Sequence, residues 1–231
     1  MFKRYKVFML LLLASLLAAN SCAPTHKYRH HLTKWESDID RFTELDRNQE
    51  YPDNSIMFLG SSSIRLWDSI EEDMAPYPVI QRGFGGSCFV DVAHYAAQET
   101  LPANLGALVL FAGNDIWGTE EDRTPEEIGK LLEYTIRKVR KRHPTMPLFV
   151  IEVTHVPKRE HLIAEIDAEN RELERVCGKH EQVYWIATKS MFLTQDNKIR
   201  REIFRDDDIH QNEEGYQQWT RLIKTEIKKW L

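Results

Sequence analysis

Five short apolar segments alternate with longer amphipathic segments along this chain, and this alternation constrains its fold more than any other feature. The apolar segments are rich in Val, Ile, Leu and Phe, and they cover residues 56–59, 79–80, 107–112, 148–153 and 183–186. The amphipathic segments at 124–142, 160–177 and 213–230 are typical of helices. Strands that are apolar on both faces need helices on both sides. The pattern therefore predicts a three-layer α/β/α domain around a five-stranded parallel sheet.

Polar residues and glycines follow three of these predicted strands. Gly-Ser-Ser-Ser at 60–63 follows the first, Gly-Phe-Gly-Gly-Ser at 83–87 the second, and Gly-Asn-Asp at 113–115 the third. A fourth group, Asp-Asp-Ile-His at 207–210, immediately precedes the last predicted helix. Each group alone is typical of an ordinary turn. Ligands bind beyond the carboxyl ends of parallel strands, so the groups together indicate a functional site at one edge of the sheet.

The residue types at this edge suit acyl transfer. A serine hydroxyl is a weak nucleophile unless a neighbouring imidazole removes its proton, and a carboxylate must orient that imidazole. Asp207 and His210 are three residues apart at a turn entering a helix, a spacing that can bring both side chains to one side. A serine at the start of a helix lies beside free N–H groups that can stabilise an oxyanion. Gly86 can donate its N–H, and Asn114 can donate from its side-chain amide.

In this order the four groups resemble the sequence blocks of the SGNH, or GDSL-like, esterase and lipase family, and the resemblance covers residues 56–216. It implies Ser62, Asp207 and His210 as the catalytic residues. It also implies the N–H groups of Ser62 and Gly86 and the amide of Asn114 as the oxyanion hole. A flavodoxin-like form of the predicted sheet, and a reaction that needs no cofactor and no metal, follow from the same resemblance.

Two positions depart from the family pattern. Ser61 stands where the family has the aspartate of Gly-Asp-Ser, which leaves Ser61 and Ser63 as alternatives to the favoured Ser62. Residues 206–208 are all aspartates, and the spacing to His210 selects Asp207 among them.

The N-terminus has the organisation of an export signal. Lys3, Arg4 and Lys6 precede an apolar run at 7–19 and the small residue Ser21, an order typical of a secretory signal peptide. As a helix the run spans about 20 Å, short of the roughly 30 Å core of a bilayer, which favours a cleaved signal over a permanent span. The sequence therefore predicts a signal peptide at 1–21 and an exported protein.

Cys22 follows the stretch Ala-Asn-Ser and resembles the cysteine that is acylated in bacterial lipoproteins. It is therefore the predicted attachment point for a lipid, with the membrane as a partner and the cell envelope as the location. Cleavage by an ordinary signal peptidase, giving a periplasmic or secreted protein, is the alternative. Residues 22–50 are expected to form a polar tether and a first amphipathic helix, and residues 51–231 the hydrolase domain.

Charge and cysteine content exclude other classes. The formal net charge is -5, and loss of three basic residues with the signal would make it -8, so no basic excess is present to bind nucleic acid. Cys88 and Cys177 are expected either as buried apolar residues or as one disulfide. No cysteine and histidine spacing is typical of a zinc site.

Several residues near the predicted site have open roles. His155 follows the fourth strand, but no carboxylate stands at a spacing that would orient it, and His94 and His143 are expected at the surface. Aromatic residues flank the site and either shape an acyl or sugar pocket or pack in the core; they are Phe84, Phe89 and Trp117. The acidic stretch at 120–126 is either a lid or a solvated connection.

We therefore expect a serine esterase that cleaves O-acetyl or other short acyl groups, including those on carbohydrate, through an acyl-enzyme. Its expected partner is a small ester or acylated glycan; lysophospholipid also fits the residues. An acyltransferase with the same residues and a non-catalytic glycan-binding module are the alternatives.

Overall fold

The computed structural model describes residues 24–28, 32–97 and 101–231. The predicted signal peptide at 1–21 and the predicted lipid attachment site, Cys22, lie outside the described residues. Within the described ranges no helix is long and apolar enough to cross a bilayer.

All five predicted strands are present and form one parallel sheet in the order β2-β1-β3-β4-β5. Their bounds are Ser55–Gly60 for β1, Val79–Gly83 for β2, Leu105–Phe111 for β3, Leu148–Ile151 for β4 and Val183–Ile186 for β5. The register pairs Gly60 with both Gly83 and Phe111, so the carboxyl ends of β1, β2 and β3 meet at one edge. The predicted five-stranded parallel sheet is confirmed.

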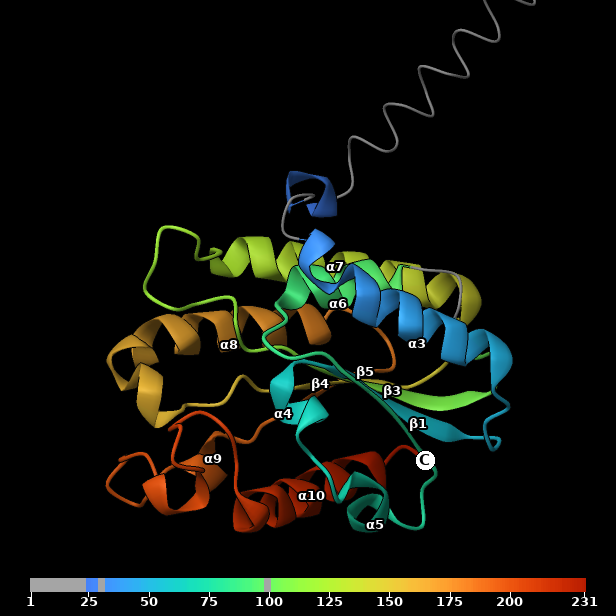
Figure 1. Ribbon diagram of the computed structural model, residues 1–231. Helices are drawn as coiled ribbons and strands as arrows, with labels where there is room; N and C mark the ends of the chain where they lie inside the picture. The colour runs from blue at the N-terminus through green and yellow to red at the C-terminus, as the bar shows by residue number, and fades with distance from the viewer. Residues whose placement is uncertain (1–23, 29–31, 98–100) are drawn as a thin grey trace, which may run out of the picture.

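Helices cover both faces of the sheet (Figure 1). One face carries α3 (Glu36–Asn48), α6 (Phe89–Ala96), α7 (Pro125–Arg142) and α8 (Ile163–Cys177). The opposite side has α4 (Ser62–Arg65), α5 (Ile70–Met74), α9 (Lys189–Phe192) and α10 (Glu213–Ile227). Short 3-10 helices occupy Pro24–Tyr28 (η1), Thr33–Trp35 (η2), Pro157–Leu162 (η3) and Arg201–Ile203 (η4). The predicted three-layer α/β/α architecture is confirmed.

Alternate side chains of each strand enter two separate cores. Met57 and Leu59 pack with the α3, α6, α7 and α8 side, whereas Ile56 and Phe58 pack with the α5 and α10 side. All four are fully buried, because successive side chains of a strand point to opposite faces and both faces are covered. This two-sided burial is why the strands are continuously apolar in sequence.

Helix α6, which contains His94, is not among the helices whose ranges the sequence predicted. Seven of its eight residues are buried, so the segment is mostly apolar and too short for a helical period to stand out in sequence. Its start is fixed by a capping box, in which the Asp91 carboxylate accepts the Cys88 N–H at 2.8 Å. By contrast α7 begins where its cap predicts, with Thr124 and Glu127 bonded to each other's backbone N–H groups.

The described part of the predicted tether is packed against the domain. Residues Pro24–Tyr28 form η1, next to α6 and α7 (Figure 1). The guanidinium of Arg123 lies 4.6 Å from the centre of the half-buried Tyr28 ring, and Lys27 forms an ion pair with Glu127. These contacts join residues about 100 positions apart, so no local pattern predicts them.

The strand order has its switch point between β1 and β3, where a ligand crevice is expected at the carboxyl ends of the strands. The chain leaves β1 toward β2 on one side and later leaves β3 toward β4 on the other, and ligands bind where such connections diverge. Gly60 allows the two strand ends to approach, because a Cβ there would lie 1.9 Å from the Phe111 carbonyl oxygen. The Gly-Ser-Ser-Ser and Gly-Asn-Asp groups flank this crevice.

Candidate active site

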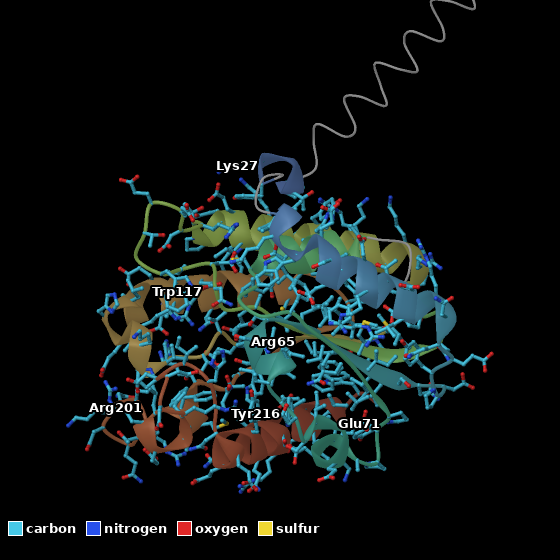
Figure 2. The ribbon with its side chains drawn as sticks, viewed as in Figure 1. Lys27, Arg65, Glu71, Trp117, Arg201 and Tyr216 are labelled. Atoms are coloured by element: carbon cyan, nitrogen blue, oxygen red, sulfur yellow. The ribbon has the colours of Figure 1, made fainter. Side chains whose placement is uncertain are left out.

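Ser62 is the first residue of α4, directly after β1. The Ser61 N–H donates to the Phe111 carbonyl at 2.9 Å, which fixes the turn to the neighbouring strand. On the other side the Tyr216 hydroxyl of α10 donates to the Ser63 carbonyl, also at 2.9 Å. Figure 2 shows Arg65 of this short helix near the centre of the view and Tyr216 in the helical layer below. The serine turn is therefore held from both sides.

The structure brings Ser62, His210 and Asp207 into one hydrogen-bonded line. His210 Nε2 lies 2.7 Å from Ser62 Oγ, and His210 Nδ1 lies 2.5 Å from Asp207 Oδ2. The second carboxylate oxygen, Asp207 Oδ1, accepts the N–H groups of Ile209 and His210 at 2.9 Å each. Both carboxylate oxygens are therefore occupied, and the aspartate cannot turn away from the ring.

The charge on Asp207 decides the tautomer of His210. Burial raises the pKa of Asp207, but the hydrogen bonds from the His210 ring and from two backbone N–H groups outweigh it and lower the pKa to about 2. An ionised carboxylate only accepts, so Nδ1 carries the proton and Nε2 faces the serine unprotonated. The Ser62 hydroxyl donates to Nε2, which is the arrangement of a serine poised to lose its proton.

Arg205 connects the histidine loop to the serine turn, a role that sequence reasoning missed. Its guanidinium donates to the Gln211 carbonyl at 3.0 Å and to the Leu66 carbonyl, at the end of the serine helix, at 3.1 Å. Its backbone N–H donates to the His210 carbonyl at 2.8 Å. One side chain thus fixes two segments that are 139 residues apart in sequence.

Replacing Arg205 by methionine should lower kcat by about 10- to 100-fold with little change in KM, because the His210 ring would no longer be held against Ser62. Lysine should restore little, since one ammonium cannot copy the two directed bonds of a guanidinium. Arg221→Met is the matched control, because this exposed arginine bonds only within its own helix among the described residues. Steady-state kinetics of the three variants test the role; equal kcat values in Arg205→Met and Arg221→Met would exclude it.

Gly86 and Asn114 lie beside each other at the ends of β2 and β3. Asn114 Nδ2 donates to the Ser87 carbonyl at 3.0 Å, which joins the two loops. Gly86 has a φ of 75°, a conformation that favours glycine. The preceding loop also contacts the serine helix, since a Cβ on Gly85 would lie 2.9 Å from Arg65 Nε.

Buried charged residues support the loop that carries Asn114. The Arg159 guanidinium donates to the carbonyls of Gly113 and Ile116, and Asp115 accepts the Phe89 N–H at the start of α6 at 2.9 Å. Arg159 and Asp115 are almost fully buried. A signal for Asp115 was visible in the Gly-Asn-Asp group, but nothing near Arg159 in sequence links it to this loop.

The predictions for the other histidines need correction. His155 does have a carboxylate neighbour, because Asp167 of α8 brings its Oδ1 to 3.0 Å from Nε2. His143 is buried and His94 is half-buried, so neither is the surface residue expected. Burial lowers the pKa of all three rings. The Ser62 hydroxyl is nevertheless bonded to His210.

The other residues whose roles the sequence left open either pack in the core or lie beside the site. Phe84 and Phe89 are buried in the core, whereas Trp117 is exposed beside the site. Cys88 and Cys177 are free and buried, so they do not form the disulfide considered as an alternative. The acidic stretch is an ordered loop, because the Asp122 carboxylate accepts the Trp117 and Gly118 N–H groups at 2.9 and 2.7 Å.

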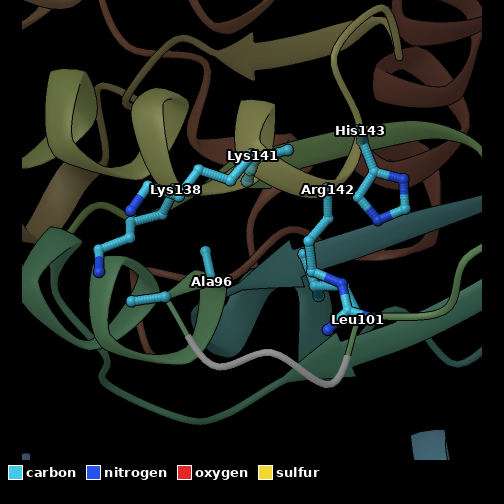
Figure 3. A pocket seen from close by; sticks show the side chains of 8 residues that line it. Ala96, Leu101, Lys138, Lys141, Arg142 and His143 are labelled. Carbon is cyan, nitrogen blue, oxygen red and sulfur yellow. The ribbon is translucent and has the colours of Figure 1, made fainter.

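Two cavities differ in whether they can hold an ester. A cleft of about 660 Å³ opens beside Gly86 and Asn114, within the size range of ligand sites. A second cavity, of about 60 Å³, lies at the far ends of α6 and α7 (Figure 3). It has room for about two waters and is lined by basic side chains of α7 such as Lys138 and Lys141. Of these two cavities, only the first is lined by predicted site residues, Gly86 and Asn114. In the described part of the chain, no three His, Cys, Asp or Glu side chains group in a way that could hold a metal ion.

The sequence matches the profile of the GDSL-like Lipase/Acylhydrolase family over residues 55–218, more than two thirds of the chain. This span includes each of the residues implied by the resemblance. A search of curated proteins finds no significant relative.

Solved structures share the fold at low sequence identity. A Streptococcus pneumoniae protein, provisionally described as a platelet activating factor, has a TM-score of 0.73 at 19% identity, covering 93% of this chain and 98% of its own. A GDSL-like lipase from Bacteroides thetaiotaomicron has a TM-score of 0.63 at 18% identity, covering 84% and 98%. A carbohydrate esterase family 3 protein from Talaromyces cellulolyticus has a TM-score of 0.56 at 16% identity, covering 76% and 96%.

Proposed function

Because this chain belongs to the GDSL-like lipase/acylhydrolase family and is a carboxylic ester hydrolase, we propose that it releases short acyl groups through an acyl-enzyme formed on Ser62. The observation that carries the proposal is the line of Asp207, His210 and Ser62, with contacts of 2.5 and 2.7 Å. A nucleophile, a base and an orienting acid in hydrogen-bond contact are what acyl transfer requires.

In the proposed reaction Ser62 Oγ attacks the ester carbonyl while His210 Nε2 takes the hydroxyl proton. Asp207 stabilises the imidazolium that forms. The carbonyl oxygen becomes an oxyanion and accepts hydrogen bonds from the N–H groups of Ser62 and Gly86 and from the amide of Asn114. When the tetrahedral intermediate collapses, His210 gives its proton to the leaving alcohol. Water, activated by the same histidine, then cleaves the acyl-serine bond and releases the acid.

Replacing Asn114 by alanine should lower kcat by about 10²- to 10³-fold, equivalent to roughly 2.7 to 4 kcal/mol of transition-state stabilisation. The amide is proposed to meet charge that exists only in the transition state, so KM should change little. Asn104→Ala is the matched control, because Asn104 is an exposed asparagine bonded to Tyr51 and Asp53 at the other end of β3. Hydrolysis of p-nitrophenyl acetate measures both variants. An equal kcat in the two would remove Asn114 from the oxyanion hole.

We propose O-acetyl and other short acyl esters, including those on carbohydrate, as the substrate class. The charged lining of the cleft beside Gly86 supports this choice over long-chain lipids. Fold neighbours described as a carbohydrate esterase and as an acetyl esterase are consistent with it.

A panel of p-nitrophenyl esters from acetate to palmitate, together with acetylated oligosaccharides, tests this function. We expect the highest kcat/KM for two- to four-carbon acyl groups and release of the free acid. Transfer of the acyl group to an added sugar in place of water would reassign the protein as an acyltransferase. Glycan binding with no turnover of any ester would overturn the proposed hydrolysis.

A further inference from the structure

Two segments far apart in the sequence build the cleft beside Gly86 and Asn114. One wall comes from η1 and η2, through Lys27, Tyr28 and Lys34, and the other from the loop that contains Trp117. Figure 2 labels Lys27 on the N-terminal helical turn and Trp117 lower down, nearer the sheet, both on the side of the sheet that α7 covers. The N-terminal segment is therefore part of the wall that a bound substrate would meet.

The lining of this cleft is polar. Six of the twelve described residues that line it are charged, and none of the twelve is Leu, Ile, Val, Met or Phe. An alkyl chain placed there would strip water from charged groups without replacing its hydrogen bonds, which is costly. A polyhydroxylated ligand would replace those hydrogen bonds, so the lining favours a sugar over a lipid chain.

Two aromatic rings in the cleft are each backed by a buried arginine. The Arg159 guanidinium lies 4.9 Å from the Trp117 ring centre, and the Arg123 guanidinium lies 4.6 Å from that of Tyr28. Arg159 and Arg123 are only 4% and 8% exposed, so the surrounding protein holds both side chains in place. The two rings are thus held in place before any ligand arrives, which lowers the entropy cost of binding to them.

The loop backbone fixes Trp117 further. The Asp122 carboxylate accepts the N–H groups of Trp117 and Gly118, and the Thr119 hydroxyl donates to the same carboxylate at 3.0 Å. Burial raises the pKa of Asp122, but these hydrogen bonds outweigh it and hold the pKa below its ordinary value. Trp117 is 36% exposed, which makes it one of the few large hydrophobic residues open to solvent in the described part of the chain.

We propose that this cleft is a sugar-binding subsite, in which Trp117 offers a flat face to the carbohydrate part of an acylated substrate. Tyr28, with the Lys27 ammonium 5.3 Å from its ring centre, forms the opposite wall. Lys34 and Glu121 lie in the same cleft and supply a donor and an acceptor for its hydroxyl groups. The proposal rests on the proposed function, because it assigns the group attached to the ester that Ser62 cleaves. The group is a sugar, and the segments that contact it are η1, η2 and the loop that contains Trp117.

The test compares Trp117→Ala with Trp230→Ala. Trp230 is also exposed, at 50%, but it lies at the C-terminus, stacked on Tyr184 with ring centres 4.0 Å apart. The substrates are partly O-acetylated trisaccharides of xylose, glucose and N-acetylglucosamine, with p-nitrophenyl acetate as a substrate that carries no sugar. Trp117→Ala should lower kcat/KM for at least one trisaccharide, and this loss should be about tenfold larger than its loss for the aryl ester. Most of the difference should come from a higher KM for the trisaccharide. Trp230→Ala should leave that ratio unchanged.

A binding measurement separates the subsite from the chemistry. Titrating Ser62→Ala protein with the non-acetylated trisaccharides should change its tryptophan fluorescence, and the change should be lost when Trp117→Ala is added. Hydrolysis of p-nitrophenyl acetate without any such change would overturn the subsite and leave the esterase function standing. Faster cleavage of lysophosphatidylcholine than of every trisaccharide, with a Trp117→Ala defect on the lipid, would also overturn it. Sugar binding without ester hydrolysis would support the subsite and reject the esterase function.

Discussion

Replacing Ser62 by alanine should abolish ester hydrolysis, with a fall in kcat on the order of 10⁶-fold, and leave the fold intact. The variant loses the atom that forms the covalent bond, so neither His210 nor the oxyanion donors can act on an acyl-enzyme. The cost in stability should be about 1 kcal/mol, because one partly solvated hydrogen bond is lost and alanine fits the same space. p-Nitrophenol release and circular dichroism measure the two effects.

The neighbouring serines are the natural controls, because the sequence left them as alternatives. Ser61→Ala and Ser63→Ala should retain activity within about tenfold, since the structure bonds only the Ser62 hydroxyl to His210 among these three side chains. A fluorophosphonate probe should label wild-type protein once, and peptide mass spectrometry should locate the label on Ser62. Loss of labelling in Ser61→Ala or Ser63→Ala, with labelling kept in Ser62→Ala, would move the nucleophile to another position.

Replacing Asp207 by asparagine should lower kcat by about 10⁴-fold with the geometry preserved. An amide cannot stabilise the imidazolium as a carboxylate does, and it allows the ring to adopt the tautomer that presents N–H to the serine. Asp206→Asn and Asp208→Asn are matched controls from the same run of aspartates. Asp208 has a φ of 59°, which asparagine tolerates as well as aspartate does, so that variant should fold normally and keep most of its activity.

The low pKa of Asp207 also determines how activity depends on pH. Its pKa lies at about 2, below the ordinary value, so the carboxylate is ionised in the folded protein at every pH above that point. Because the carboxylate stays ionised, protonation of Asp207 should not contribute to any fall of kcat/KM until the pH approaches about 2. The stabilisation that the ionised carboxylate gives the fold is present above its ordinary pKa and is lost as pH falls toward about 2. Protonation of Asp207 well above about 2, seen as an acid limb of the kcat/KM profile that is absent from Asp207→Asn, would contradict this assignment.

The sheet, and the closeness of Ser62, His210 and Asp207, were predictable because both leave local signatures. Strands buried on two faces are continuously apolar, and Phe58 and Val109 are fully buried as that pattern requires. Asp207 and His210 are close in sequence, and Ser62 follows a strand directly, so the topology brings them to the same edge. Local pattern and fold agree at these positions, which is why four short groups sufficed to predict that these side chains lie together.

The supporting residues could not be predicted because their contacts are long-range and mostly to backbone carbonyls. Arg205 reaches Leu66, and Arg159 reaches Gly113, yet an arginine that bonds a carbonyl requires no particular residue at the other end. The same is true of His155, whose carboxylate neighbour lies twelve positions further on, in α8. Sequence spacing predicts contacts within one turn or one helix. It could not predict these contacts, because each of them joins two different elements.

The packing of Pro24–Tyr28 against the domain has a consequence for where the enzyme can work. A single residue separates Cys22 from Pro24, and a chain extends at most about 3.6 Å per residue. We propose that Cys22 carries the acyl group, in which case the chain allows at most roughly 7 Å between its Cα and that of Pro24, where the turn whose Lys27 and Tyr28 line the cleft begins. The cleft could then sample only a thin shell above the bilayer. The rate of hydrolysis would then depend on the surface density of glycan chains beside the membrane. Freely diffusing esters would reach the enzyme only when they entered that shell.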